Sequence, residues 1–251
     1  MCLINFHYGE HPNYKLIVAA NRDESYARPT AAANYWEDYP NLLAGRDLLH
    51  LGTWLGVTKS GRFAALTNYR DPAEFDVDKQ SRGDIVKDFL TDIVSPAIFL
   101  ETLNKNKDAY AGFNVIMGDA NTLFYYSNKQ AEIVEIPTGT HSLSNHLLNT
   151  PWPKVTKGQS RLRDYVLQHD VIEPALLFDI LQDTEIAADG QLPDTGVGLE
   201  LERQLSPLFI KTPDYGTRSS TVVLLGHDQR ITFVERTYLN GELASENRFE
   251  I

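Results

Sequence analysis

The order of strand-forming and helix-forming segments constrains the fold of this chain most strongly. Strands come first, and a pair of helices, more strands, a second helix pair and final strands complete the 251-residue sequence. Strands joined by short turns form antiparallel hairpins, and helices bury an apolar stripe on a sheet. The sequence therefore predicts an α+β fold, a four-layer αββα sandwich of two mostly antiparallel sheets. Because no repeat or linker-like segment interrupts this order, we expect a single domain over residues 1–251.

The expected elements are apolar runs that end at turn or capping residues. The first hairpin joins residues 3–8 to 14–20 across the turn cluster 9–13, and the second joins residues 53–58 to 63–68. Helices are expected after Ser81, after the N-capping pair Ser95-Pro96, near residues 160–168 and over residues 174–181. Further strands are expected at 113–117, 123–127, 133–136, 220–225, 231–236 and 246–251. We expect residues 36–50 and 184–197 to be irregular, and the acidic segment 71–78 to be a solvated loop.

The charge balance restricts the partners of the protein. Lys and Arg number 23 and Asp and Glu number 34, which gives a formal net charge of −11. Nucleic acids and anionic membrane surfaces both select clustered positive charge, so we expect a small-molecule substrate or a hydrophobic ligand instead. No segment approaches the ~20 apolar residues that span a bilayer, and polar residues interrupt the N-terminal segment, so no membrane insertion and no secretory signal are expected. The single cysteine cannot form an internal disulfide, so a cytoplasmic location is expected.

That single cysteine is Cys2. Its position can be an accident, because many proteins have a small residue there. The chemical interpretation is that removal of Met1 leaves a cysteine with both a thiol and a free α-amino group. A nucleophile activated by the amine of its own chain terminus is a known catalytic device, and the α-amino pKa of about 7.7–8.0 suits a general base.

The first hairpin places polar residues close to Cys2. A turn centred near His11 pairs Cys2 with Ala20, and Arg22 then lies beside Cys2 on the same face of the sheet. The tetrad Asn21-Arg22-Asp23-Glu24 follows the apolar strand. The tetrad can be the strand emerging into water. Alternatively, Arg22 stabilises a thiolate, Asp23 orients the α-amine and Asn21 donates to an oxyanion.

Three more polar residues lie at expected strand ends: Asn68, Asn145 and Arg218. Taken singly, the asparagines are typical of turns and the arginine of a surface ion pair. Together with Cys2 and Arg22 they supply a nucleophile, two amide donors and two cations, which suits acyl transfer through a tetrahedral intermediate. His141 and His146 have no third ligand at a suitable spacing, and no phosphate-binding loop or Gly-x-Ser-x-Gly motif is present, so we expect no metal and no cofactor.

Short motifs along the chain resemble the NRDE family, which is named for transport and Golgi organisation. The motifs are MC at the start, AANRDE at 19–24, GTWLGV at 52–57, ALTNYR at 65–70, SRGD at 81–84, GFN at 112–114, LSN at 143–145, NTPWPK at 149–154 and YGTRSST at 215–221. The resemblance implies an Ntn-hydrolase-like αββα sandwich. Members of the family have been linked to secretory organisation, lipid and mitochondrial metabolism, and haem movement.

A more distant resemblance is to the cysteine Ntn amidases of the choloylglycine hydrolase and penicillin acylase group. It implies that Cys2 is the nucleophile and that Asn21-Arg22-Asp23 is the Asn-x-Asp pair that ends the second strand. Those enzymes usually carry an arginine just before that asparagine, where this chain has Ala20. The resemblance also implies that Asn68 and Asn145 are oxyanion or substrate-binding asparagines and that Arg218 is a late site arginine.

Two function classes follow from these residues. The first is a cysteine N-terminal-nucleophile hydrolase that cleaves linear amides of a small acylated substrate, with Cys2, Arg22, Asp23, Asn68, Asn145 and Arg218 as site residues. The second is a protein that uses the same pocket to bind or carry haem or a lipid without turnover. An inert scaffold that has lost a working site is the third alternative.

Overall fold

The chain divides into two units, each built on one antiparallel sheet. The first contains residues 1–27, 138–144 and 148–251, and the second contains residues 28–137 and 145–147. The computed structural model describes residues 2–74, 79–119 and 121–251. Part of the acidic segment predicted to be a solvated loop, residues 75–78, therefore lies outside the described residues. The single domain expected over residues 1–251 stays a prediction.

The sheet of the first unit has the strand order β10-β1-β2-β11-β12-β13. Its strands are β1 (Cys2–Tyr8), β2 (Tyr14–Ser25), β10 (Gly139–Leu143), β11 (Tyr215–Gly226), β12 (Ile231–Leu239) and β13 (Glu242–Glu250). Its helices are α3 (Pro153–Val166), α4 (Pro174–Leu181), α5 (Leu199–Gln204) and the 3-10 helix η3 (Asp189–Gln191). Helices α3 and α4 pack on one face, where Leu162 and Phe178 meet Ile17 and Val222 of the sheet.

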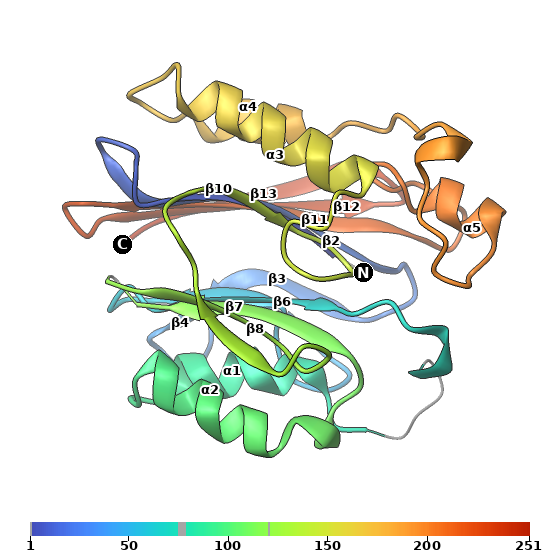
Figure 1. Cartoon of the computed structure of the whole chain (residues 1–251). Coiled ribbons are helices and arrows are strands. Elements are labelled where there is room, and N and C mark those ends of the chain that lie inside the picture. The colour runs from blue at the N-terminus through green and yellow to red at the C-terminus, as the bar shows by residue number, and fades with distance from the viewer. Residues whose placement is uncertain (1, 75–78, 120) are drawn as a thin grey trace. The chain divides into compact units, whose positions relative to one another are not determined.

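The sheet of the second unit has the strand order β3-β4-β5-β6-β7-β8-β9. Its strands are β3 (Thr30–Tyr35), β4 (Leu42–Asp47), β5 (Leu55–Thr58), β6 (Phe63–Asn68), β7 (Phe113–Gly118), β8 (Leu123–Ser127) and β9 (Glu132–Glu135). Helices α1 (Arg82–Thr91) and α2 (Pro96–Lys105) cover one face of this sheet (Figure 1), and η1 (Pro72–Glu74) and η2 (Lys107–Ala109) are 3-10 helices. The predicted cap of α2 is confirmed, because the Ser95 side chain accepts a hydrogen bond from the Ile98 backbone N–H.

Several sequence-based boundaries are wrong for identifiable reasons. Residues 36–50, expected to be irregular, contain β4, and its alanine and glycine give little strand signal of their own. Helix α3 begins at Pro153 rather than near Ser160, since Pro153 starts the helix at its first position. Strands β2 and β11 extend past their apolar runs, so the tetrad 21–24 and Arg218 lie inside strands. Among the described residues, none of the helices has the length and apolar character needed to cross a bilayer.

Candidate functional site

Cys2 lies at the start of β1 and faces the polar end of β2. The strands are antiparallel, and Cys2 pairs directly with Arg22, while Ala20 pairs with Ile4. The expected pairing of Cys2 with Ala20 is wrong because Tyr8 pairs with Leu16, which centres the turn on Pro12 rather than on His11. Gly9 adopts a positive φ of 79°, and its N–H bonds to the Lys15 carbonyl. The error is two residues, so the prediction that Cys2 and Arg22 share a face of the sheet is confirmed.

The Cys2 sulfur is buried, and opposing charges act on it. Burial raises the pKa of the Cys2 thiol, and the negative charge of Asp23 raises this pKa further. The positive charge of Arg22 and a hydrogen bond from the Asp23 backbone N–H lower the pKa of the same thiol. Burial has the largest effect, so the thiol form is favoured in the chain as it stands.

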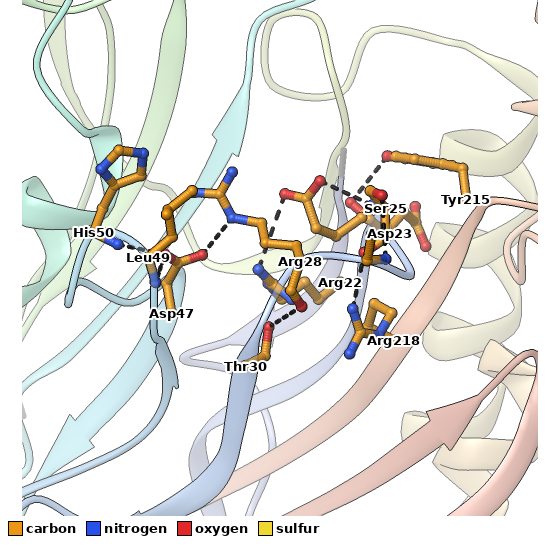
Figure 2. A network of polar contacts seen from close by, with 12 residues as sticks. Arg22, Asp23, Ser25, Arg28, Thr30, Asp47, Leu49, His50, Tyr215 and Arg218 are labelled. Atoms are coloured by element: carbon orange, nitrogen blue, oxygen red, sulfur yellow. Dashed lines mark hydrogen bonds and ion pairs between the residues drawn. The ribbon is translucent and has the colours of Figure 1, made fainter.

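Asp23 is buried at the same end of the sheet and is held by β11. Its Oδ1 atom accepts a hydrogen bond of 2.7 Å from the Thr217 hydroxyl. The Tyr215 hydroxyl donates to the Asp23 backbone carbonyl at 2.9 Å (Figure 2). Burial raises the pKa of the Asp23 carboxyl, and the strongest opposing influence is the positive charge of Lys154. The first three residues of the tetrad are therefore buried rather than emerging into water: Asn21 is 0% exposed, Arg22 7% and Asp23 1%, whereas Glu24 is half-buried.

Arg218 belongs to the same region of the first unit. The pairing of β11 with β2 is irregular between Thr217 and Ser219, and Arg218 is the residue at this bulge. Its guanidinium donates to the carbonyl oxygens of Ser25 and Tyr26 at 2.8 and 3.2 Å (Figure 2). Burial lowers the pKa of Arg218, and the positive charge of Arg22 lowers it further. The two arginines are therefore within electrostatic reach of each other.

The two predicted asparagines lie in the second unit and contact each other. Asn68 is the last residue of β6, and the Asn145 side-chain amide donates to its backbone carbonyl at 2.9 Å. The Arg70 backbone N–H donates to the Asn145 carbonyl at 2.7 Å, which fixes the loop after β10. The structure thus brings together Cys2, Arg22, Asp23 and Arg218 in one unit and Asn68 with Asn145 in the other. The role of the two asparagines as oxyanion donors stays a prediction.

Sequence reasoning missed two residues that contact or act on this group. Thr217 holds the Asp23 carboxyl, and Lys154 lies buried in the first turn of α3. The sequence carried a signal for Lys154, because a positive charge in the first turn of a helix opposes the helix dipole. A lysine directly after Pro153 at a helix start therefore indicates a nearby anion.

The two histidines considered as ligands make ordinary polar contacts. His141 Nδ1 lies 3.0 Å from the Asn149 amide nitrogen, and His146 Nε2 lies 2.8 Å from the Tyr69 hydroxyl. Across residues 2–74, 79–119 and 121–251, no group of three His, Cys, Asp or Glu side chains could hold a metal ion.

Sequence comparison finds one matching family and several relatives that align with nearly the whole chain. Residues 1–240 match the family described as Transport and Golgi organisation 2. The Transport and Golgi organization protein 2 homolog of Homo sapiens is 33% identical, over 97% of this chain and 95% of that protein. The homolog of Bos taurus is 35% identical, over 96% and 95%. Transport and Golgi organization protein 2 of Drosophila melanogaster is 28% identical, over 94% and 92%.

Two solved structures share the fold. The C2A mutant of conjugated bile acid hydrolase from Clostridium perfringens matches with a TM-score of 0.57 and 12% identity, over 100% of this chain and 92% of that chain. The Caenorhabditis elegans ortholog of N-acylethanolamine-hydrolyzing acid amidase matches with a TM-score of 0.50 and 9% identity, over 89% and 92%. The fold class expected from the sequence, α+β with two mostly antiparallel sheets of the Ntn-hydrolase type, is confirmed.

Proposed function

The chain belongs to the Transport and Golgi organisation 2 family, and we propose that it is a cysteine N-terminal-nucleophile hydrolase acting on linear amide bonds of a small acylated substrate. One observation carries this proposal: Cys2, the sole cysteine, is paired with Arg22 while the Asp23 N–H donates to its sulfur. The similar bile acid hydrolase, whose C2A mutant was solved, also has a cysteine at its second position.

The proposed mechanism requires removal of Met1, which exposes the α-amine of Cys2. An α-amine has an ordinary pKa of about 7.7–8.0, so near neutral pH it can exchange a proton with the thiol. Its positive form also favours the thiolate, because an adjacent cation lowers a thiol pKa. Asp23 orients this amine, and Arg22 stabilises the thiolate on the shared face of the sheet.

In the proposed reaction the Cys2 sulfur attacks the amide carbonyl carbon while the α-amine takes the thiol proton. A C–S bond forms, and the carbonyl oxygen carries the negative charge of the tetrahedral intermediate. The intermediate collapses by breaking its C–N bond, and the leaving nitrogen takes the proton from the α-ammonium group. Water then adds to the thioester, giving its proton to the amine, and breakage of the C–S bond releases the carboxylic acid and restores the thiol.

The partners proposed with this activity follow from the charge. A net charge of −11 supports a small-molecule substrate or hydrophobic ligand over a nucleic acid. The single cysteine, which cannot form an internal disulfide, supports a cytoplasmic location.

A trapping experiment tests the activity. Protein without Met1, verified by intact mass, is incubated with a panel of linear N-acyl amides and with activated acyl esters across a range of pH. We expect an acyl adduct on Cys2, and we expect none on a Cys2→Ala variant or on protein that retains Met1. If no substrate or thiol probe modifies Cys2 at any pH where thiolate forms, the proposal is wrong.

The burial of Cys2 favours a second candidate function, which is binding without turnover. Burial raises the pKa of the Cys2 thiol, and a protonated, enclosed sulfur is a poor nucleophile. In this alternative the same site carries haem or a lipid. Titration with haem would then give a Soret shift that disappears in Cys2→Ala or in a histidine variant, whereas a flat titration excludes the haem version.

A further inference from the structure

Lys154 is an unusual residue for the place it occupies. It is 2% exposed and lies directly after Pro153 in the first turn of α3. A positive charge at this end of a helix is disfavoured by the helix dipole, and a buried ammonium group needs an anionic partner. Two separate penalties therefore oppose this residue, so a specific partner must compensate for them.

The packing around Lys154 brings it to the end of β1 where Cys2 lies. Its chain neighbours Trp152 and Val155 form one apolar cluster with Leu208 and with Leu3, the residue after Cys2. The start of α3 is thus fixed against the start of β1.

Asp23 is the partner that the structure offers. Asp23 directly follows Arg22, which pairs with Cys2 at the same end of β1 on which the start of α3 packs. The Asp23 carboxyl is 1% exposed and accepts a hydrogen bond from Thr217, and Lys154 is the charge that most strongly opposes the effect of burial on the pKa of this carboxyl. The Thr217 hydroxyl also accepts a hydrogen bond of 3.0 Å from the Ile210 backbone N–H, so its remaining proton points to Asp23. Thr217 thus donates a hydrogen bond to this buried carboxyl, and Lys154 is the cation with the largest effect on it.

We propose that Lys154 is a positioning residue whose buried ammonium group pairs with the Asp23 carboxyl beside Cys2, so that Asp23 can hold the α-amine that acts as the base. The inference rests on the proposed hydrolase function for its purpose, although the pairing of Lys154 with Asp23 can be tested without it. Without Lys154, burial would neutralise the carboxyl, and a neutral acid would not orient the ammonium form of the amine.

A double-mutant cycle in thermal unfolding tests the pairing itself. We compare wild type, Lys154→Met, Asp23→Asn and the double variant. Removing one partner of a buried pair leaves the other charge uncompensated, whereas replacing both leaves none. The double variant should therefore have a higher Tm than Lys154→Met, and should fold even where Lys154→Met does not. Additive losses of Tm would overturn the pairing, whether or not the protein turns over any substrate.

The pH profile of Cys2 alkylation by iodoacetamide, in protein without Met1, tests the positioning role. In Lys154→Met the Asp23 carboxyl becomes neutral, so its charge no longer raises the pKa of the Cys2 thiol. The midpoint pH of Cys2 alkylation should therefore fall by about 1 pH unit. Lys154→Arg should retain the wild-type midpoint. Lys157→Met is the matched control, because Lys157 lies on the same helix but pairs with Asp183 and Glu185 at the surface.

The outcomes separate the two proposals. An unchanged midpoint in Lys154→Met overturns the positioning role, even if wild-type protein forms an acyl adduct. If wild type forms no acyl adduct, the proposed hydrolase function fails, while the Tm cycle still decides whether Lys154 and Asp23 act as a pair.

Discussion

At the scale of single residues, the reactivity of Cys2 depends on a balance between burial and charge. Burial and Asp23 raise the pKa of the thiol, whereas Arg22 and the Asp23 backbone N–H lower it. Arg22 is 7% exposed and pairs with Cys2 across the two strands, and its Nη2 atom lies 3.9 Å from Glu24 Oε2. Asp23 and Arg22 are therefore the two side chains whose charges act on the nucleophile, and Arg22 is the one that favours the thiolate.

Replacement of Arg22 by glutamine should make Cys2 less reactive. Loss of the positive charge raises the thiol pKa, and a rise of about 1 unit lowers the alkylation rate about tenfold at a fixed pH below that pKa. The measurement is the pH dependence of iodoacetamide modification, followed by intact mass. Arg248→Gln on the exposed strand β13 is the control and should alkylate at the wild-type rate. An Arg22→Gln profile that matches wild type would show that Arg22 does not act on the sulfur.

At the scale of elements, β1 is held by two neighbouring strands and by one helix. It pairs with β2 and β10, and α3 packs across it through Leu3 and Asn5. His7 also belongs to β1, is 2% exposed, and its Nδ1 atom lies 2.8 Å from the Thr140 hydroxyl of β10. Single substitutions in β1 and α3 can therefore test two contributions to the unfolding free energy of the protein: the protonation of His7 and the close approach of α3 to β1.

His7 should make the protein less stable in mild acid. Burial is the largest cause that lowers the pKa of His7 below the ordinary value of 6.5. The unfolded chain then binds a proton at a pH where the folded chain does not, so this contribution to stability is complete above pH about 6.5 and is lost as the pH falls below it. His7→Gln should lose less unfolding free energy between pH 7.5 and pH 5.5, measured by urea denaturation. The exposed His169→Gln is the control, and equal losses in His7→Gln and wild type would refute this role.

Gly158 sets the distance between α3 and β1. A Cβ atom at this position would lie 2.5 Å from Asn5 Oδ1, and that oxygen already accepts a hydrogen bond from the Ser142 hydroxyl. Gly158→Ala should lower the unfolding free energy by about 1–3 kcal/mol, which outweighs the gain of about 1 kcal/mol from helix propensity. Urea denaturation measures this loss. Gly190→Ala is the control, since no neighbouring atom lies within 4 Å of its Cβ, and a stabilised Gly158→Ala would contradict the close approach.

At the scale of the whole molecule, the sequence predicts the segments that carry their own signals. Ser95-Pro96 starts α2 as expected, and the two early hairpins form where turn residues separate apolar runs. Strand β4 was missed because its residues 42–47 are ordered by pairing with β3 and β5 rather than by their own propensity.

The sequence predicts the part of the candidate site that depends on strand alternation, but not the part that depends on tertiary packing. Cys2 and Arg22 share a face because strand alternation fixes faces, even when the register is shifted by two residues. The burial of the tetrad could not be predicted, because its polar groups are satisfied by partners distant in the sequence. Asn21 accepts a hydrogen bond of 2.5 Å from the Ser220 hydroxyl, and Thr217 donates to Asp23. The position of Lys154 after Pro153 indicates a nearby anion, but only tertiary packing brings Lys154 to the end of the sheet where Asp23 lies.

The most direct test of the account is the hydrolysis rate of a linear N-acyl amide by two forms of the same chain, one without Met1 and one that retains it. The account predicts turnover only in the form without Met1, because only that form has the α-amine that serves as base on Cys2. Turnover should also disappear in Cys2→Ala made in the form without Met1. Equal turnover in the two forms, or turnover that survives in Cys2→Ala, would contradict the claim that the N-terminal cysteine is the nucleophile.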